Sequence, residues 1–123
     1  MKIDTFSFRY GDNQGFMEWY RYSKEMGLVI EKFDGERKTA QCELTEADLE
    51  ELERVIRENR IDAWNDYCKL DLCICSGSSW TLHVTYEDSM DTFIHAMGHS
   101  EGPEGFEEGK KALEAYFEKF LRK

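Results

Sequence analysis

The sequence predicts an α+β fold: an antiparallel sheet of about six strands with two amphipathic helices packed on one face. Three observations carry this prediction. Alternating side chains fill the first 44 residues, a helical stripe follows, and a further pair of strands precedes a second helical stripe. Strands grouped in runs, with no helix between each pair, indicate an antiparallel sheet. The 123 residues contain no linker or repeat, so residues 1–123 are expected to form a single domain.

The first four strands are predicted from the period-two pattern and its turns. Phe6, Phe8 and Tyr10 alternate with polar residues, as in a strand with one buried face. Asp34-Gly35 favours a hairpin, because both residues tolerate a positive φ. The second, third and fourth strands are expected at residues 16–22, 28–33 and 37–44.

The first helix is predicted by its cap and its apolar stripe. Thr45 is a suitable N-cap, and Asp48 lies three residues later, in the capping-box position. Apolar side chains then recur at helical spacing, at Leu49, Leu52, Val55 and Ile56. This stripe predicts a helix over residues 45–59 that packs against the sheet.

The second half predicts two more strands and the closing helix. Alternation places strands at residues 80–86 and 92–97, followed by a loop over residues 98–102. Pro103 fits the first position of the last helix, because proline there loses no helical hydrogen bond. The side chains that this helix is expected to bury are Phe106, Leu113, Tyr116, Phe117 and Phe120.

The negative charge is concentrated around the first helix. The formal net charge is −10, and residues 43–66 hold nine acidic and three basic side chains. Such a surface repels phosphate backbones, so nucleic acid is not an expected partner. It suits a basic protein, and one alternative function is therefore an acidic antagonist or immunity-type protein that masks a basic partner. A solvated helix face that aids solubility explains the same charge.

Three of the four cysteines lie close together, at Cys68, Cys73 and Cys75. On a strand, residues i and i+2 have Cα atoms roughly 6.5–7 Å apart, so two thiolates could converge on Zn²⁺. Cys68 or His95 would then complete the ligand set, which makes a thiolate metal protein a second alternative. However, C-x₄-C-x-C is not a common zinc spacing. Reduced, partly buried thiols are the preferred explanation of the cluster, and we assign no metal and no cofactor.

Large side chains occupy both faces of the second predicted strand. They are Phe16, Met17, Trp19, Tyr20 and Tyr22. If helices cover one face of the sheet only, part of this set faces solvent, and a contiguous exposed aromatic patch usually marks an interface. The other interpretation is a central strand that is covered on both sides within the monomer.

Motifs of catalysis are missing from the sequence, so no catalytic residues are assigned. It contains neither a G-x-S-x-G nucleophile elbow nor a phosphate-binding glycine motif. The predicted function is a non-catalytic binding or protein-interaction module, with a homodimer through the sheet as one form of it. No stretch approaches the ~18 apolar residues of a membrane span. The first residues lack the apolar run of a secretion signal, so a cytoplasmic protein without membrane partners is expected.

An ordered series of residues in the second half resembles a family of small uncharacterised bacterial proteins. The series comprises Trp64, Gly77, Trp80, Leu82, Tyr86, Gly98, Pro103 and Phe106. The resemblance covers about half of the chain. It implies a fold type whose scaffold depends on the Trp, Gly and Pro positions, and it implies no catalytic residues.

Overall fold

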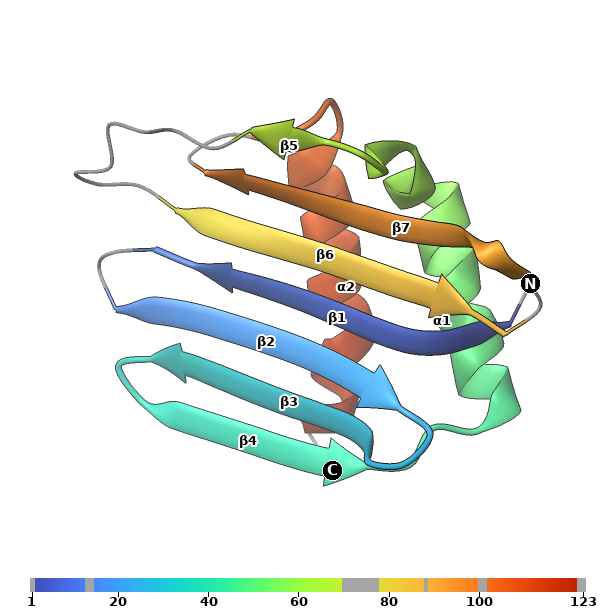
Figure 1. Cartoon of the computed structure of the whole chain (residues 1–123). Helices are drawn as coiled ribbons and strands as arrows, with labels where there is room; N and C mark the ends of the chain where they lie inside the picture. Colours follow the sequence, from blue (N-terminus) through green and yellow to red (C-terminus); the bar gives the residue numbers. More distant parts are fainter. Residues whose placement is uncertain (1, 13–14, 70–77, 88, 100–101, 122–123) are drawn as a thin grey trace.

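The chain folds into two layers, a seven-stranded sheet and a pair of helices that both lie on one face of it (Figure 1). A computed structural model describes residues 2–12, 15–69, 78–87, 89–99 and 102–121. Six strands pair antiparallel, in the chain order of four strands, a helix, two strands and a helix. The predicted α+β architecture is therefore confirmed. The seventh strand, β5, is an addition of two residues that pairs parallel to an edge.

The N-terminal strand lies at the centre of the sheet. The strand order of the sheet is β4-β3-β2-β1-β6-β7-β5, so β1 connects a meander on one side to a hairpin on the other. The meander is made of β1 (Ile3–Gly11), β2 (Phe16–Ser23), β3 (Gly27–Asp34) and β4 (Arg37–Cys42). The second group is β5 (Cys68–Lys69), β6 (Ser79–Tyr86) and β7 (Ser89–His99). Segments about half the chain apart are thus brought side by side.

Helix α1 (Glu46–Glu58) begins at the predicted cap. The Asp48 backbone N–H donates to Thr45 Oγ1 at 3.1 Å, and the Thr45 backbone N–H donates to Asp48 Oδ2 at 2.9 Å. Both halves of the capping box are therefore formed. Leu49, Leu52 and Ile56 are buried against the sheet, as the apolar stripe predicts.

Removal of this cap gives a first testable prediction. Thr45→Ala leaves one backbone donor of the first turn without its partner, and it is expected to lower the free energy of unfolding by about 1 kcal/mol. Urea unfolding followed by circular dichroism measures the change. Asp48→Ala removes the reciprocal bond and should cost a similar amount. An unchanged unfolding midpoint in both variants would contradict the role of the box.

Several element ends differ from the prediction. Strand β4 ends at Cys42 and not at residue 44, and strand β7 begins at Ser89 and not at residue 92. Helix α2 spans Phe106–Leu121, so Pro103 precedes it instead of opening it. The cause is Gly105, whose φ of +79° turns the chain just before the helix. Strand β7 extends to His99, beyond the predicted end at residue 97, because Gly98 and His99 pair with Trp80 and Ser79 of β6.

The core lies between the helices and the covered face of the sheet. At one end, the Phe117 ring of α2 stacks on Tyr20 of β2, with ring centroids 4.5 Å apart. At the other end, Trp64 contacts Trp80 and Phe106. Trp64 belongs to a single 3-10 turn, η1 (Ile61–Trp64), that follows α1. This core holds both helices on the same side of the sheet.

Candidate functional site

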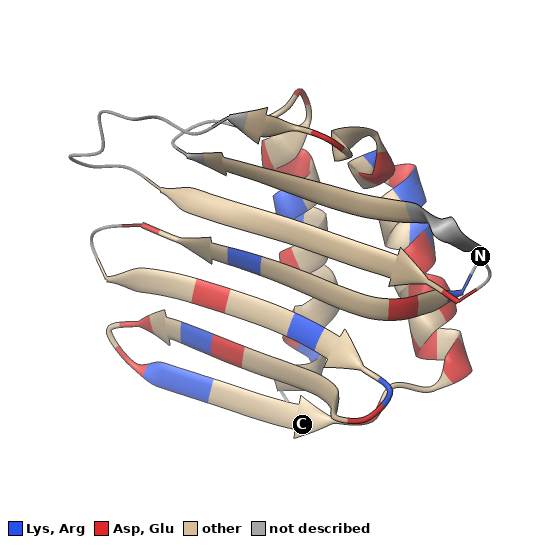
Figure 2. Cartoon of the chain, viewed as in Figure 1, with Lys and Arg blue, Asp and Glu red and all other residues tan. Residues whose placement is uncertain are grey.

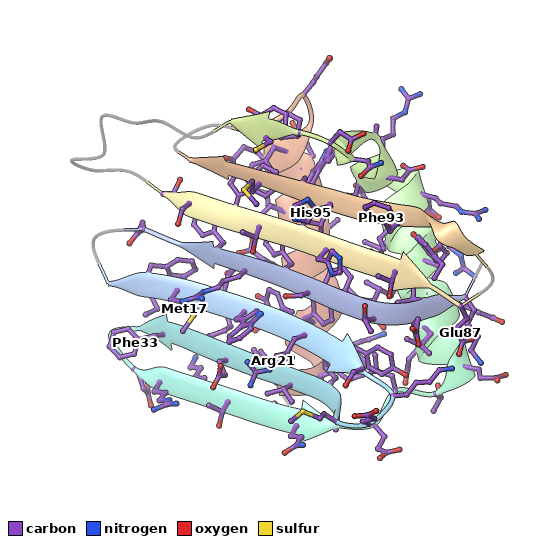
Figure 3. The ribbon with its side chains drawn as sticks, viewed as in Figure 1. Met17, Arg21, Phe33, Glu87, Phe93 and His95 are labelled. Atoms are coloured by element: carbon purple, nitrogen blue, oxygen red, sulfur yellow. The ribbon has the colours of Figure 1, made fainter. Side chains whose placement is uncertain are left out.

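One face of the sheet is left without a helix in the described part of the chain (Figures 1 and 3). Successive side chains on a strand point to opposite faces, so each strand contributes one set to the core and one to this surface. The burial patterns of β2 and β6 follow this alternation. We call the surface the open face, and we define it by Ser7, Arg9, Met17, Trp19, Arg21, Val29, Glu31, Phe33, Arg37, His83, Phe93 and His95.

Two rows of directly paired residues cross the open face, because residues in register share a face. The first row runs through Val29, Arg21, Ser7, His83 and His95. The second row runs through Glu31, Trp19, Arg9, Thr81 and Met97. The rows combine the N-terminal meander with the later hairpin, so the surface depends on the long-range pairing of β1 with β6.

Trp19 lies at the centre of the open face between two arginines. Its indole Nε1–H donates to Ser7 Oγ at 3.0 Å, which holds the ring against β1. The guanidinium carbon of Arg21 lies 4.0 Å from the ring centroid, and that of Arg9 lies 5.3 Å away. Both distances are within the range of cation–π attraction. The indole and the two guanidiniums therefore form one contiguous group.

The open face carries more positive than negative charge. The residues that define it include three arginines, Arg9, Arg21 and Arg37, and one acidic residue, Glu31. Arg21 and Arg37 both lie near this carboxylate, at 3.7 and 3.8 Å. Arg9 has no ion pair within the described residues. This excess of positive charge on the open face is opposite in sign to the net charge of the whole chain, which is −10.

Two hollows flank the Trp19 group. A groove of about 290 Å³ runs beside Trp19 and is lined by Met26, Val29 and His83. A second hollow of about 580 Å³ lies toward the other end of the strands, next to Arg9 and Met17. The first is close to the lower end of the size range of ligand pockets, ~300 Å³. Each could receive an apolar side chain of a partner.

His83 and His95 form a cross-strand pair on the open face. They are directly opposite in the β6–β7 register, and their ring centroids lie 5.7 Å apart. No local sequence pattern indicates this pair, because the register of the two strands sets it. Two imidazoles supply two metal ligands at most, and no group of three or more ligating side chains occurs within the described residues.

The predicted interface residues of β2 divide between the two faces of the sheet. Tyr20 and Tyr22 are buried under the helices, at 0% and 8% exposure, so a partner on the open face cannot reach them. Phe16 lies on the helix side as well, next to Tyr10 and Lys110. Met17 and Trp19 are left on the open face. The reason is strand alternation, which our candidate set did not separate.

The predicted thiolate set falls largely beyond what the structure describes. Cys73 and Cys75 lie outside the described residues. Cys68 is an exposed free thiol in β5, where it pairs in register with Met97 of β7. The fourth candidate, His95, faces His83 on the open face instead. A metal centre formed by these four residues stays a prediction.

The acidic segment forms the outer surface of α1 (Figure 2). Glu46, Glu50 and Glu58 are exposed there. Some of this charge is compensated from outside the helix, because Lys2 contacts Glu46 at 3.0 Å and Lys119 contacts Glu51 at 2.9 Å. Acidic charge thus dominates the helix layer and basic charge the open face.

A buried acid lies directly behind the open face. Glu18 of β2 is 0% exposed under α2, and neither of its carboxylate oxygens has a hydrogen-bond donor within the described residues. Lys110 Nζ lies 4.0 Å from its Oε1. Burial, helped by the adjacent Glu114, raises the pKa of Glu18 to about 8, although Lys110 and Lys32 oppose this. Glu18 is therefore largely protonated at neutral pH.

Comparison with known proteins gives no family assignment. No protein-family model matches the chain, and no curated protein matches it significantly in sequence. The resemblance to a family of small bacterial proteins accordingly stays a prediction. Within the described residues, no helix is long and apolar enough to cross a membrane.

Proposed function

We propose that the protein is a non-catalytic interaction module that binds another polypeptide through the open face. The observation that carries the proposal is the presence of large apolar side chains on a sheet surface that no described helix covers. Phe33 and Phe93, on strands far apart in the sheet, are 42% and 46% exposed. Met17 and Trp19 lie on strand β2 on the same face. Large apolar side chains that are partly exposed on a face without a helix support an interface there.

The composition of the surface supports the same conclusion. Aromatic residues, Met and Arg are enriched at protein interfaces, whereas Lys and Glu are depleted. The open face contains three arginines, Trp19, two phenylalanines and Met17. Full burial of an exposed Phe or Met side chain contributes ~1.5–3 kcal/mol, and these partly exposed side chains contribute less each.

Selection of short random peptides displayed on phage tests this proposal. Peptides that bind the immobilised protein are measured again against a Phe33→Ser/Phe93→Ser variant, whose changes lie at exposed positions and should leave the fold intact. We expect these changes to weaken binding by about 10-fold or more, which corresponds to ~1.4 kcal/mol. Ala47→Ser/Ala115→Ser, at exposed positions of the two helices, serves as the control. Equal binding to all three proteins would refute the proposal.

The acidic surface of α1 supports a second candidate function, the masking of a basic partner. This surface carries solvent-exposed negative charge. The side chain of Glu46 is 82% exposed, and Glu50 is exposed as well. Binding of a basic peptide by this helix should weaken as salt is added and should be lost in Glu46→Lys/Glu50→Lys. Binding that survives the charge reversal excludes this function.

A further inference from the structure

We infer that the partner of the open face presents carboxylates: an acidic polypeptide segment of another protein, with apolar side chains among its acids. The inference rests on the proposed function and adds the chemistry of the partner. It is carried by the arginines around Trp19, which outnumber the carboxylates that contact them among the described residues.

The charge count of the open face is the first step. Arg21 and Arg37 share the single carboxylate of Glu31, at 3.7 and 3.8 Å, which is longer than a hydrogen-bonded ion pair. Arg9 is exposed and has no ion pair within the described residues. The charged side chains at the end of the sheet do not change this balance, because Lys24 pairs with Asp4 and Glu87. Among the described residues, the guanidinium of Arg9 therefore has no carboxylate partner.

The order of these arginines is the second step. Arg9 and Arg21 lie against the Trp19 ring, and Ser7 fixes that ring from below. Guanidiniums that are already held in place lose less conformational freedom on binding. A planar guanidinium matches a carboxylate with two parallel hydrogen bonds. The two guanidiniums are thus preorganised to bind carboxylates. The groove between Trp19 and Met26 can accommodate an apolar side chain of the same partner.

Charge also discriminates between the possible occupants. A second copy that docked face to face would place the arginines of one open face against those of the other, which is unfavourable. A nucleic acid would meet the arginines but would also approach a chain of net charge −10. An acidic polypeptide segment supplies the missing carboxylates at a much lower charge density. We therefore favour it over both.

The experiment uses the peptides selected above, with their composition as the first readout. We expect Asp and Glu to be enriched together with apolar residues. Binding of the enriched peptides, measured by fluorescence anisotropy, should fall about 10-fold or more in Arg9→Gln/Arg21→Gln. It should stay nearly unchanged in Arg54→Gln/Lys111→Gln, which removes the same charge from exposed positions of the two helices. Added salt should weaken binding to the unaltered protein.

The outcomes separate this inference from the proposed function. Peptides that lack acids but lose binding in Phe33→Ser/Phe93→Ser overturn the inference and leave the proposed function standing. If the peptides bind Phe33→Ser/Phe93→Ser and Arg9→Gln/Arg21→Gln as tightly as the unaltered protein, both the inference and the proposed function are overturned. Tighter binding of a uridine oligonucleotide than of the acidic peptides assigns the arginines to phosphate and overturns the inference. So does a dimer, seen by analytical ultracentrifugation, that dissociates in Phe33→Ser/Phe93→Ser.

Discussion

Trp64→Ala is expected to lower the free energy of unfolding by about 3–5 kcal/mol, the usual cost of removing a fully buried aromatic ring. Trp64 is 1% exposed. Its ring lies 5.2 Å from that of Phe106 and 5.8 Å from that of Trp80, so it joins α2 and β6 to the turn after α1. Its indole Nε1 has no hydrogen-bond partner within the described residues, so the loss comes from packing. Urea unfolding monitored by circular dichroism gives the value.

Gly109→Ala, made in the unaltered protein and in Trp64→Ala, tests whether the packing of the Trp64 ring is the cause of this loss. A Cβ added at Gly109 of α2 would lie 2.6 Å from the Trp64 ring, so glycine is needed there for the ring to fit. Gly109→Ala alone is therefore expected to destabilise, because overpacking costs ~1–3 kcal/mol. In the Trp64→Ala protein, the same change should become neutral or stabilising, since alanine favours the helix by ~1 kcal/mol and its methyl group enters the cavity. An equal effect in both backgrounds would show that the two positions are not coupled.

The fold could be predicted because its signals are local. Alternation, turn residues and the capping box of Thr45 and Asp48 each depend on a few neighbouring residues, and together they define four strands, a helix, two strands and a helix. The start of α2 was missed because of a local turn at Gly105, whereas the end of β7 and the presence of β5 depended on long-range pairing. Strand β7 extends to His99 because His99 pairs with Ser79 of β6. The two-residue strand β5 forms because Cys68 pairs with Met97 of β7.

The candidate site was predicted in part only, for the same reason. Sequence placed an aromatic surface on β2, and alternation alone could have separated Met17 and Trp19 from Tyr20 and Tyr22. The remaining members of the open face required the strand order. Arg9 comes next to Trp19 and Thr81 because β1 lies between β2 and β6, and no local pattern defines that position.

Glu18 contradicts the alternation that orders the rest of β2. It lies on the buried side with Tyr20 and Tyr22, where the pattern calls for an apolar residue. Charged groups from two other elements face it: Lys110 and Glu114 of α2, and Lys32 of β3. The pKa of Glu114 is lowered: burial acts to raise it, but Lys110, which donates to Glu114 Oε2 at 3.1 Å, and Lys32 lower it. Glu18 and Glu114 therefore hold one proton and one negative charge between them, beside the Lys110 ammonium.

The stability of the protein is expected to fall between about pH 5 and pH 8 because of Glu18. The folded state keeps a proton on Glu18 up to a pKa of about 8, whereas the ordinary pKa of a glutamate side chain is 4.5. The folded protein thus binds more protons than the unfolded chain in this interval, and stability decreases as pH rises. Each unit of pKa difference corresponds to about 1.4 kcal/mol, so the decrease is on the order of 2–4 kcal/mol.

Glu18→Gln should remove this decrease, since the amide has the shape of the protonated acid and no proton to lose. The variant is expected to resemble the unaltered protein near pH 5 and to be more stable by on the order of 2–4 kcal/mol near pH 8. Urea unfolding at a series of pH values measures both. The lowered pKa of Glu114 affects stability below this interval and the raised pKa of Lys110 affects it above, so neither masks the effect.

Glu107→Gln, at an exposed position of α2, removes the same charge without touching the buried group and should keep the slope of the unaltered protein. If Glu18→Gln also kept that slope, the dependence would originate elsewhere and Glu18 would be ionised under α2 at neutral pH. Its charge would then have to be balanced by Lys110 and Lys32 alone. Loss of the slope in Glu18→Gln, with the control unchanged, would instead establish that α2 packs on a neutral acid in the folded protein.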